Sequence, residues 1–253
     1  MSQVVDRRKF LASTSAVAVT VAMAPAKLFA QVADGAADAS ANTLYERIFA
    51  EAVATSPELA SSLGLDRGPN AGLKGQLSPR TVERRQAELA RTNAARAALA
   101  AIDRSTLSSA GQLNLDVVRY QLDTQVAAQT RFGMDGVMRP YRIFQQGGAY
   151  FSVPDFLNTA HTVRSSEDAE AYLSRLEQFG SVLDQESVRQ REEATRGLLA
   201  PAWSLDLTLG QMRALRGQAA ADSSMTRSLA NRAAAANIPG DWAARATRSA
   251  MSA

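Results

Sequence analysis

Few residues of this sequence have the type and spacing that catalysis needs. The chain contains no cysteine and a single histidine, His161, whereas zinc hydrolases usually need two histidines, often four residues apart on one helix. A serine–histidine–aspartate triad would have to combine His161 with neighbours such as Ser152 and Asp155. The Gly-x-Ser-x-Gly turn that exposes a nucleophilic serine is missing, however. We therefore predict no catalytic and no metal-binding residue here, and we expect His161 to be structural or solvated.

Two pairs of adjacent carboxylates lie in charged helical contexts. Glu167-Asp168 falls in the first turn of an expected helix, where negative charge favours the helix dipole. Glu192-Glu193 is expected on a solvated face together with Arg189 and Arg196. Neither pair resembles a buried catalytic pair, and the sequence contains no P-loop and no dinucleotide-binding glycine motif.

The segment from Gly133 to His161 is the candidate for ligand binding, because it holds five of the fifteen aromatic residues and a Gly-Gly pair. In one interpretation it is a long connection whose rings fill a core made otherwise of alanine. In the other it lines a substrate cleft, with amides for hydrogen bonds, flexible backbone and a ring as a wall. The candidate cleft residues are Gln145, Gln146, Gly147, Gly148 and Tyr150.

The first thirty residues have the layout of an export signal. Arg7 and Arg8 are followed by Phe10 and Leu11, which is the pattern of a twin-arginine signal, and cleavage is expected at Ala30. The apolar run over residues 12–24 is too short to cross a membrane, so we expect no stable membrane anchor. The twin-arginine translocase is the expected partner during export. The mature chain is expected in the periplasm or secreted.

The distribution of charge along the chain argues against nucleic acid as a partner. Four of the 28 basic residues and one of the 25 acidic residues lie in the first thirty positions, which leaves 24 of each in the rest of the chain. The formal charge of +3 therefore belongs to the leader. Without a basic field in the mature chain, we expect no binding to nucleic acid.

The mature chain is patterned as helices. Residues 31–43 lack apolar periodicity and are expected to form a flexible leader, and residues 44–253 to form a helical domain. Alanine, the best helix former, occupies 49 positions and lets helices approach closely. No run alternates long enough for a sheet, apart from a short extended stretch at residues 141–144. We predict an all-α fold, a multi-helix array of long antiparallel helices with one irregular segment rich in aromatics and glycine.

Capping residues set the expected ends of the helices. Ser56 and Ser78 each precede a proline and are expected to be N-caps, and the second helix is expected to reach about Asp103. The next is expected over Ser109–Phe132, with Gly133 as its stop. Further helices are expected over residues 166–196, 204–215 and 224–237, and from residue 241 onward.

Several runs of the sequence resemble the bacterial family called domain of unknown function 885. The most specific is Pro-Tyr-Arg-Ile-Phe-Gln-Gln-Gly-Gly-Ala-Tyr-Phe-Ser-Val-Pro-Asp-Phe-Leu at residues 140–157. Residues 168–176, 183–185, 198–215 and the Gly-Asp-Trp at 240–242 are similar to the same family. The resemblance covers nearly all of the chain from about Leu44.

The resemblance implies a chemistry for longer proteins. Members of this family are mostly helical and carry a His-Glu-x-x-x-x-His-His segment in their C-terminal half, like zinc metallopeptidases of the helical gluzincin kind. In such a site two histidines and a downstream carboxylate hold zinc, and a glutamate activates the water. This chain ends at Ala253, before such a segment. The resemblance thus implies an incomplete domain, the N-terminal portion of a larger fold, with zinc only in the missing C-terminal half and no cofactor in this chain.

Two functions follow as hypotheses. The first is the N-terminal helical portion of an exported metallopeptidase-like hydrolase, inactive alone; its zinc-binding half could also be encoded separately and associate with this chain. The alternative is a non-catalytic periplasmic helical binding module that uses the Gly147-Gly148 segment on a peptide or partner. An incomplete domain should leave an apolar face uncovered near its end. The residues expected on that face are Ile238, Trp242, Ala243, Ala246, Ala250 and Met251.

Overall fold

A computed structural model describes residues 35–134, 136 and 139–252. The predicted export signal, with Arg7, Arg8, Phe10, Leu11 and Ala30, lies outside these residues. Within the described chain the regular elements are α-helices and short 3-10 helices, and no β-strand forms. The predicted all-α class is confirmed.

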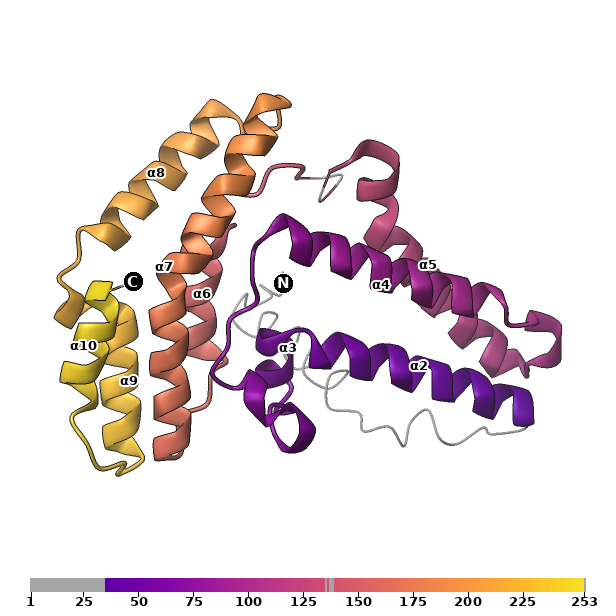
Figure 1. The fold of residues 1–253 in the computed structure, drawn as a ribbon, viewed down its shortest axis with the longest axis horizontal. Helices are drawn as coiled ribbons and strands as arrows, with labels where there is room; N and C mark the ends of the chain where they lie inside the picture. Colours follow the sequence, from indigo (N-terminus) through magenta and orange to yellow (C-terminus); the bar gives the residue numbers. More distant parts are fainter. Residues whose placement is uncertain (1–34, 135, 137–138, 253) are drawn as a thin grey trace, which may run out of the picture.

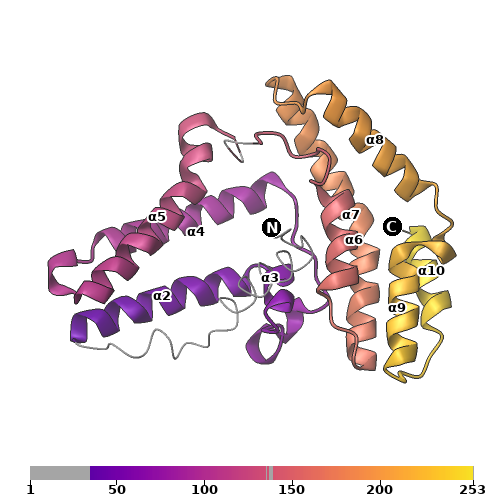
Figure 2. The same cartoon turned by 180° about the vertical axis from the view of Figure 1, so that it is seen from behind.

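The helices form two groups that lie next to each other (Figure 1). The first, which we call the arm, contains α2 (Ala36–Ala54), α4 (Val82–Ala100) and α5 (Ser109–Phe132). The second, which we call the bundle, contains α6 (Ala149–Thr159), α7 (Ser166–Thr195), α8 (Ala202–Arg216), α9 (Ser224–Ala235) and α10 (Trp242–Ser252). Between them lie α3 (Pro57–Ser62) and the 3-10 helix η2 (Gly68–Leu73), which Figure 2 shows from behind. Two shorter 3-10 helices, η3 (Arg104–Thr106) and η4 (Ala220–Asp222), precede α5 and α9.

Helix α7 is the central element of the bundle, in contact with α6, α9 and α10. Its N-cap is Ser165, whose hydroxyl accepts a hydrogen bond from the backbone N–H of Asp168 at 3.2 Å. Tyr172, Leu176 and Phe179 repeat at helical spacing on its buried face. The prediction of a helix across this region is confirmed.

Helices α4 and α5 form an antiparallel hairpin in the arm (Figure 1). Leu99 and Leu115 are fully buried between them and α2. The hydroxyl of Ser108 caps α5, and Gly133 ends it in the left-handed conformation at φ 63°. The predicted bounds of this helix are confirmed.

Helix α2 begins at Ala36, inside the stretch predicted to be a flexible leader, so that prediction is wrong from Ala36 onward. The alanine-rich sequence has high helix propensity, which does not require an apolar stripe. Asp38 also attaches this helix to the start of α5. Its buried carboxylate accepts hydrogen bonds from the backbone N–H of Ser108 at 3.1 Å and from the Ser108 hydroxyl.

Ser78 does not cap a helix, contrary to the prediction. Helix α4 starts three residues later, after Thr81, whose hydroxyl accepts from the backbone N–H of Arg84 at 3.2 Å. Ser78 instead donates to Glu58 through its backbone N–H, at 3.0 Å, and through its hydroxyl. Ser78 is thus attached to α3, and the cap of α4 falls on Thr81. Ser56 does precede α3, with Pro57 at the first position, but its side chain makes no capping hydrogen bond.

The connection predicted over residues 133–161 contains a helix, α6, which the sequence pattern did not reveal. Pro154 lies inside this helix, where proline normally disfavours helical structure. Gly148, at φ 102°, precedes the helix, and the carboxylate of Glu186 accepts from the backbone N–H of Ala149 at 2.5 Å. The stretch at 141–144 forms no strand; only an isolated bridge joins Phe144 to Gly147.

Helix α10 packs into the bundle core against α7 and α9. Ile238, Trp242 and Ala246 are buried there, and Ala250 packs against the same core. The prediction of an uncovered apolar face is therefore wrong for these four residues, whereas Ala243 is exposed as predicted. Met251, which is 77% exposed, lies outside the core.

Candidate functional site

His161 lies buried directly after α6, with both ring nitrogens in hydrogen bonds. Nε2 donates to the backbone carbonyl of Asp168 at 2.9 Å, and Nδ1 accepts from Nη1 of Arg175 at 2.6 Å. A carbonyl only accepts and a guanidinium only donates, so the neutral ring carries its proton on Nε2. The rings of Phe156 and Tyr172 pack edge-to-face against the imidazole, with interplanar angles of 87° and 90°.

The surroundings of His161 keep it uncharged. Burial, together with the positive charges of Arg175 and Arg232, lowers its pKa to about 4. Since both nitrogens are occupied, none is left to activate Ser152, and Asp155 is exposed on the surface of α6. The position of His161 is that of a structural residue, not of a general base.

Arg175 is fully buried and ties α7 to the link between arm and bundle. Besides His161, it donates to the carbonyls of Gln76 at 2.8 Å and Leu73 at 3.1 Å, and to the hydroxyl of Ser61 at 2.7 Å. Its guanidinium also lies over the Phe156 ring, 4.8 Å from the centroid. Burial lowers the pKa of Arg175 to about 10, so it stays charged at neutral pH.

The candidate cleft residues occupy different environments. Gln146 is exposed with φ 66°, and Gln145 donates its backbone N–H to Ser204 at 3.5 Å. Gly147 lies against the Phe144 ring, where an added Cβ would clash. Tyr150 is buried, and its hydroxyl bonds the carbonyl of Phe144 at 2.9 Å and the side chain of Gln211 at 2.8 Å.

Gly148 lines a cavity of about 320 Å³, and the other four candidate residues are not in its lining. We call it the neighbouring cavity. The charged side chains in its lining are Arg80, Arg139, Arg142 and Glu186. The structure therefore does not bring Gln145, Gln146 and Tyr150 together around this space.

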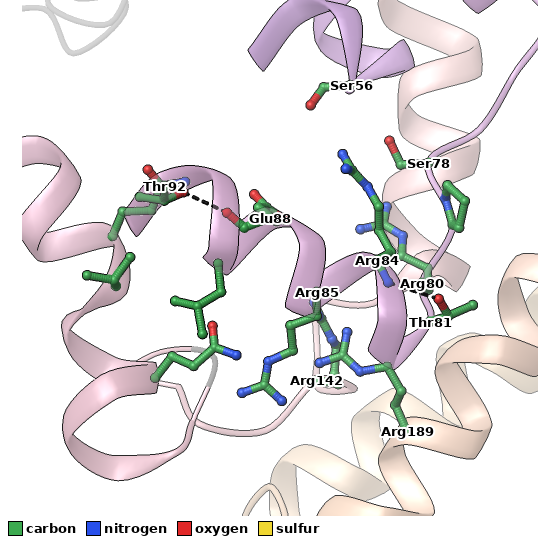
Figure 3. A pocket seen from close by; sticks show the side chains of 15 residues that line it. Ser56, Ser78, Arg80, Thr81, Arg84, Arg85, Glu88, Thr92, Arg142 and Arg189 are labelled. Carbon is green, nitrogen blue, oxygen red and sulfur yellow. Dashed lines mark hydrogen bonds between the residues drawn. The ribbon is translucent and has the colours of Figure 1, made fainter. Parts of the chain in front are cut away.

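A second cavity, of about 370 Å³, opens beside the first turns of α4. We call it the arginine cavity, because five arginines of the described chain line it: Arg80, Arg84, Arg85, Arg142 and Arg189. Figure 3 shows that they come from separate parts of the chain, the start of α4, the irregular segment and α7. Glu88 contributes the one carboxylate among the described lining residues.

Several of these arginines are held by the surrounding structure. Arg84 donates to the carbonyl of Thr55. With the amide of Gln129 oriented to present its oxygen, that oxygen accepts from Nε of Arg85 at 2.7 Å. Arg189 pairs with Glu193, one turn further along α7, at 3.6 Å. Such contacts fix where the guanidinium planes lie.

Sequence reasoning missed this cavity. Arg189 and Glu193 were expected on a solvated face, but both are buried, so that prediction is wrong. Arg196, in contrast, is exposed, and it donates to the carbonyl of Gly133 at 2.9 Å. The signal in the sequence was the adjacent pair Arg84-Arg85, four residues after Arg80. Charged helical residues are usually solvated, so this pair did not indicate a cavity. The approach of residue 142 to α4 depends on the tertiary fold.

The described residues offer neither a cluster of metal ligands nor a helix that could span a membrane. No group of three or more His, Cys, Asp or Glu side chains there is placed to hold a metal ion. None of its helices combines the length and hydropathy of a membrane span.

A family model described as "Bacterial protein of unknown function (DUF885)" matches residues 57–253. The chain belongs to this family. The matched range includes every arginine of the arginine cavity, the irregular segment and the whole bundle, whereas α2 precedes it.

One solved structure, described as "the putative lipoprotein from Colwellia psychrerythraea", has the same fold as this DUF885 chain, with a TM-score of 0.75 and 13% identity. The match covers 85% of this chain but only 38% of that one, so the chain spans well under half of its structural relative. A comparison with curated proteins finds no significant match.

Proposed function

We propose that this chain is the N-terminal helical portion of a larger hydrolase of the metallopeptidase kind, and that it is catalytically inactive alone. The supporting observation is one of length: the chain shares its fold with a structure of which it spans only 38%. Zinc would then be held outside this chain, by two histidines and a carboxylate of a C-terminal portion. That portion is encoded either with this chain or separately.

A reconstitution experiment tests this proposal. The mature chain is purified alone and together with the C-terminal portion of a longer DUF885 protein, and zinc content and peptide hydrolysis are measured. Alone, the chain should retain no stoichiometric zinc after dialysis and should not hydrolyse peptides. The mixture of the two portions should retain zinc and hydrolyse peptides. Hydrolysis by the chain alone, or a stoichiometric zinc that is lost in His161→Ala, would contradict the proposal, as would an inactive mixture.

A non-catalytic periplasmic binding module is the second candidate function. The observation that favours it is the firm placement of the aromatic and glycine-rich segment, with Tyr150 bonded to Gln211 and Ile143 to Gln190 at 3.0 Å. A preformed segment loses little entropy when a peptide or partner binds. The coding DNA beyond residue 253 separates the two candidates: a His-Glu segment there favours the hydrolase, and unrelated sequence favours the module.

Both candidates act outside the cytoplasm. We propose that Arg7 and Arg8 direct the folded chain to the twin-arginine translocase, and that the mature chain works in the periplasm or is secreted.

A further inference from the structure

The arginine cavity concentrates positive charge at the junction of arm and bundle. Its described lining has five guanidinium groups against the single carboxylate of Glu88. The neighbouring cavity shares two of these arginines and adds one arginine and one glutamate. Even when Glu193, the partner of Arg189, is also counted, the cationic groups outnumber the acidic ones. The low-dielectric walls of a cavity focus such a field and attract anions.

The arrangement of the arginines indicates more than one anionic group. Arg80 precedes α4 and Arg85 lies in its first turn, whereas Arg142 belongs to the irregular segment and Arg189 to α7, so the guanidinium groups reach the cavity from separate elements (Figure 3). Each guanidinium is a planar fork that matches an oxyanion bidentately. A ligand with acid groups at both ends can use forks on different walls, whereas a single small ion reaches one wall.

The remaining lining residues favour hydrogen bonding to carboxylates. Gln125 and Gln129 supply amide donors, whereas the hydroxyl of Ser78 already donates to Glu58. The N-terminus of the 19-residue helix α4 also lies at the cavity, and its dipole adds positive potential. Among the described lining residues there is no glycine and no lysine. Phosphate-binding loops commonly use both, with backbone N–H groups around the phosphate.

The volume of about 370 Å³ lies within the range of small-molecule sites. We propose that the arginine cavity binds a small ligand that carries two or more carboxylate groups, either a short acidic peptide or a free polycarboxylic acid. This site stands independently of the hydrolase proposal, because it requires no zinc and no C-terminal portion.

Calorimetric titration of the purified mature chain tests the ligand class. The probes are N-acetyl-Glu-Glu, citrate, pyrophosphate and the uncharged matched peptide N-acetyl-Gln-Gln-amide. The acidic peptide should bind, the uncharged one should not, and high NaCl should weaken binding. Binding of citrate as well as the peptide assigns a general polycarboxylate site, and binding of the peptide alone assigns a peptide site. Tighter binding of pyrophosphate, equal binding of the uncharged peptide, or no binding of either acid would overturn the proposal.

Charge-removing variants locate the site. Arg85→Gln and Arg142→Gln should each weaken binding of N-acetyl-Glu-Glu by about tenfold, the loss expected for one charged hydrogen-bonding partner. Arg213→Gln removes the same charge from the exposed surface of α8 and serves as the matched control, with affinity unchanged. An equal loss in the control would mean that general surface charge attracts the probe, and would overturn the assignment.

A labelling experiment covers the case in which a variant fails to fold. Phenylglyoxal modifies accessible arginines, and mass spectrometry gives the extent of modification at each one. N-acetyl-Glu-Glu should slow modification of Arg85 and Arg142 in the unaltered chain, while Arg213 reacts at the same rate. Unchanged rates at Arg85 and Arg142 under saturating peptide would place the ligand elsewhere.

Discussion

Nη1 of Arg175 donates to Nδ1 of His161 over 2.6 Å, in a site where both side chains are buried. The contact holds the imidazole neutral, because a protonated ring would present an N–H to a cation. The carbonyl of Asp168 takes the remaining ring proton. The single histidine of the chain thus acts as an acceptor for a buried arginine and joins α7 to the end of α6.

The stability of the protein should fall in acid because of His161. Below pH 6.5 the unfolded chain binds a proton on this residue, whereas the folded chain does so only near pH 4. The unfolded state therefore binds more protons in this window, and stability is lost as the pH falls through it. Between pH 8 and pH 5 the loss is about 2 kcal/mol.

Urea unfolding at several pH values measures this loss. His161→Gln is the control, because it removes the titrating group; its stability should vary less between pH 8 and pH 5. If both proteins lose stability equally across that range, His161 is not held neutral by its surroundings.

Replacing Arg175 by methionine should destabilise the fold by about 3 kcal/mol or more, since buried carbonyls and the Ser61 hydroxyl lose their donor. Arg175→Lys keeps the charge but cannot supply the same set of donors, so it should recover only part of the loss. Equilibrium urea unfolding measures both, with exposed Arg213→Met as the control. A change in Arg175→Met as small as in that control would contradict the role of Arg175.

Two glycine substitutions should act in opposite directions. An alanine Cβ at Gly111 would overlap the Asp38 carboxylate, so Gly111→Ala should cost about 1–3 kcal/mol and loosen α2. Gly210 lies in the exposed part of α8 with open space around it, so Gly210→Ala should stabilise by up to about 1 kcal/mol. Thermal melts give the two shifts, and hydrogen exchange in α2 reports the loosening. Stabilisation by Gly111→Ala would show that Asp38 does not hold α2 as described.

Conversion of Arg7 and Arg8 together to lysine should retain the protein in the cytoplasm at its uncleaved size. Fractionation and immunoblotting of cells expressing the two forms measure this. Export and cleavage of the double variant would show that the signal is not of the twin-arginine kind.

The extent of α5 could be predicted because its ends are set locally. The Ser108 hydroxyl accepts from the backbone N–H three residues later, and Gly133 adopts the left-handed conformation that residues with a side chain avoid. The start of α4 could not, because two candidate caps lie close together and Thr81, not Ser78, caps the helix. Ser78 is instead held by Glu58, twenty residues away. Donation to a carboxylate does not by itself prevent capping, since Ser108 donates to Asp38 and still caps α5. The tertiary fold decides which candidate begins the helix.

The arginine cavity was not predictable for a related reason. Arg85, Arg142 and Arg189 are far apart in sequence and meet only because the arm folds back beside α7. A pattern of charges at helical spacing is the same for a solvated face and for a cavity wall. Only the tertiary arrangement distinguishes the two.

The hydrogen bonds of Arg175 to the chain between α3 and α4 have a mechanical consequence for the junction of arm and bundle. Apolar surfaces can slide past each other at little cost, but hydrogen bonds from one planar group to several carbonyls are directional. A rotation of this link against α7 would have to break these bonds, and also the bond from the N–H of Arg80, just before α4, to Gln185 of α7 at 2.8 Å. The junction should therefore be rigid, so that the walls of the arginine cavity on α4 and α7 keep a constant separation.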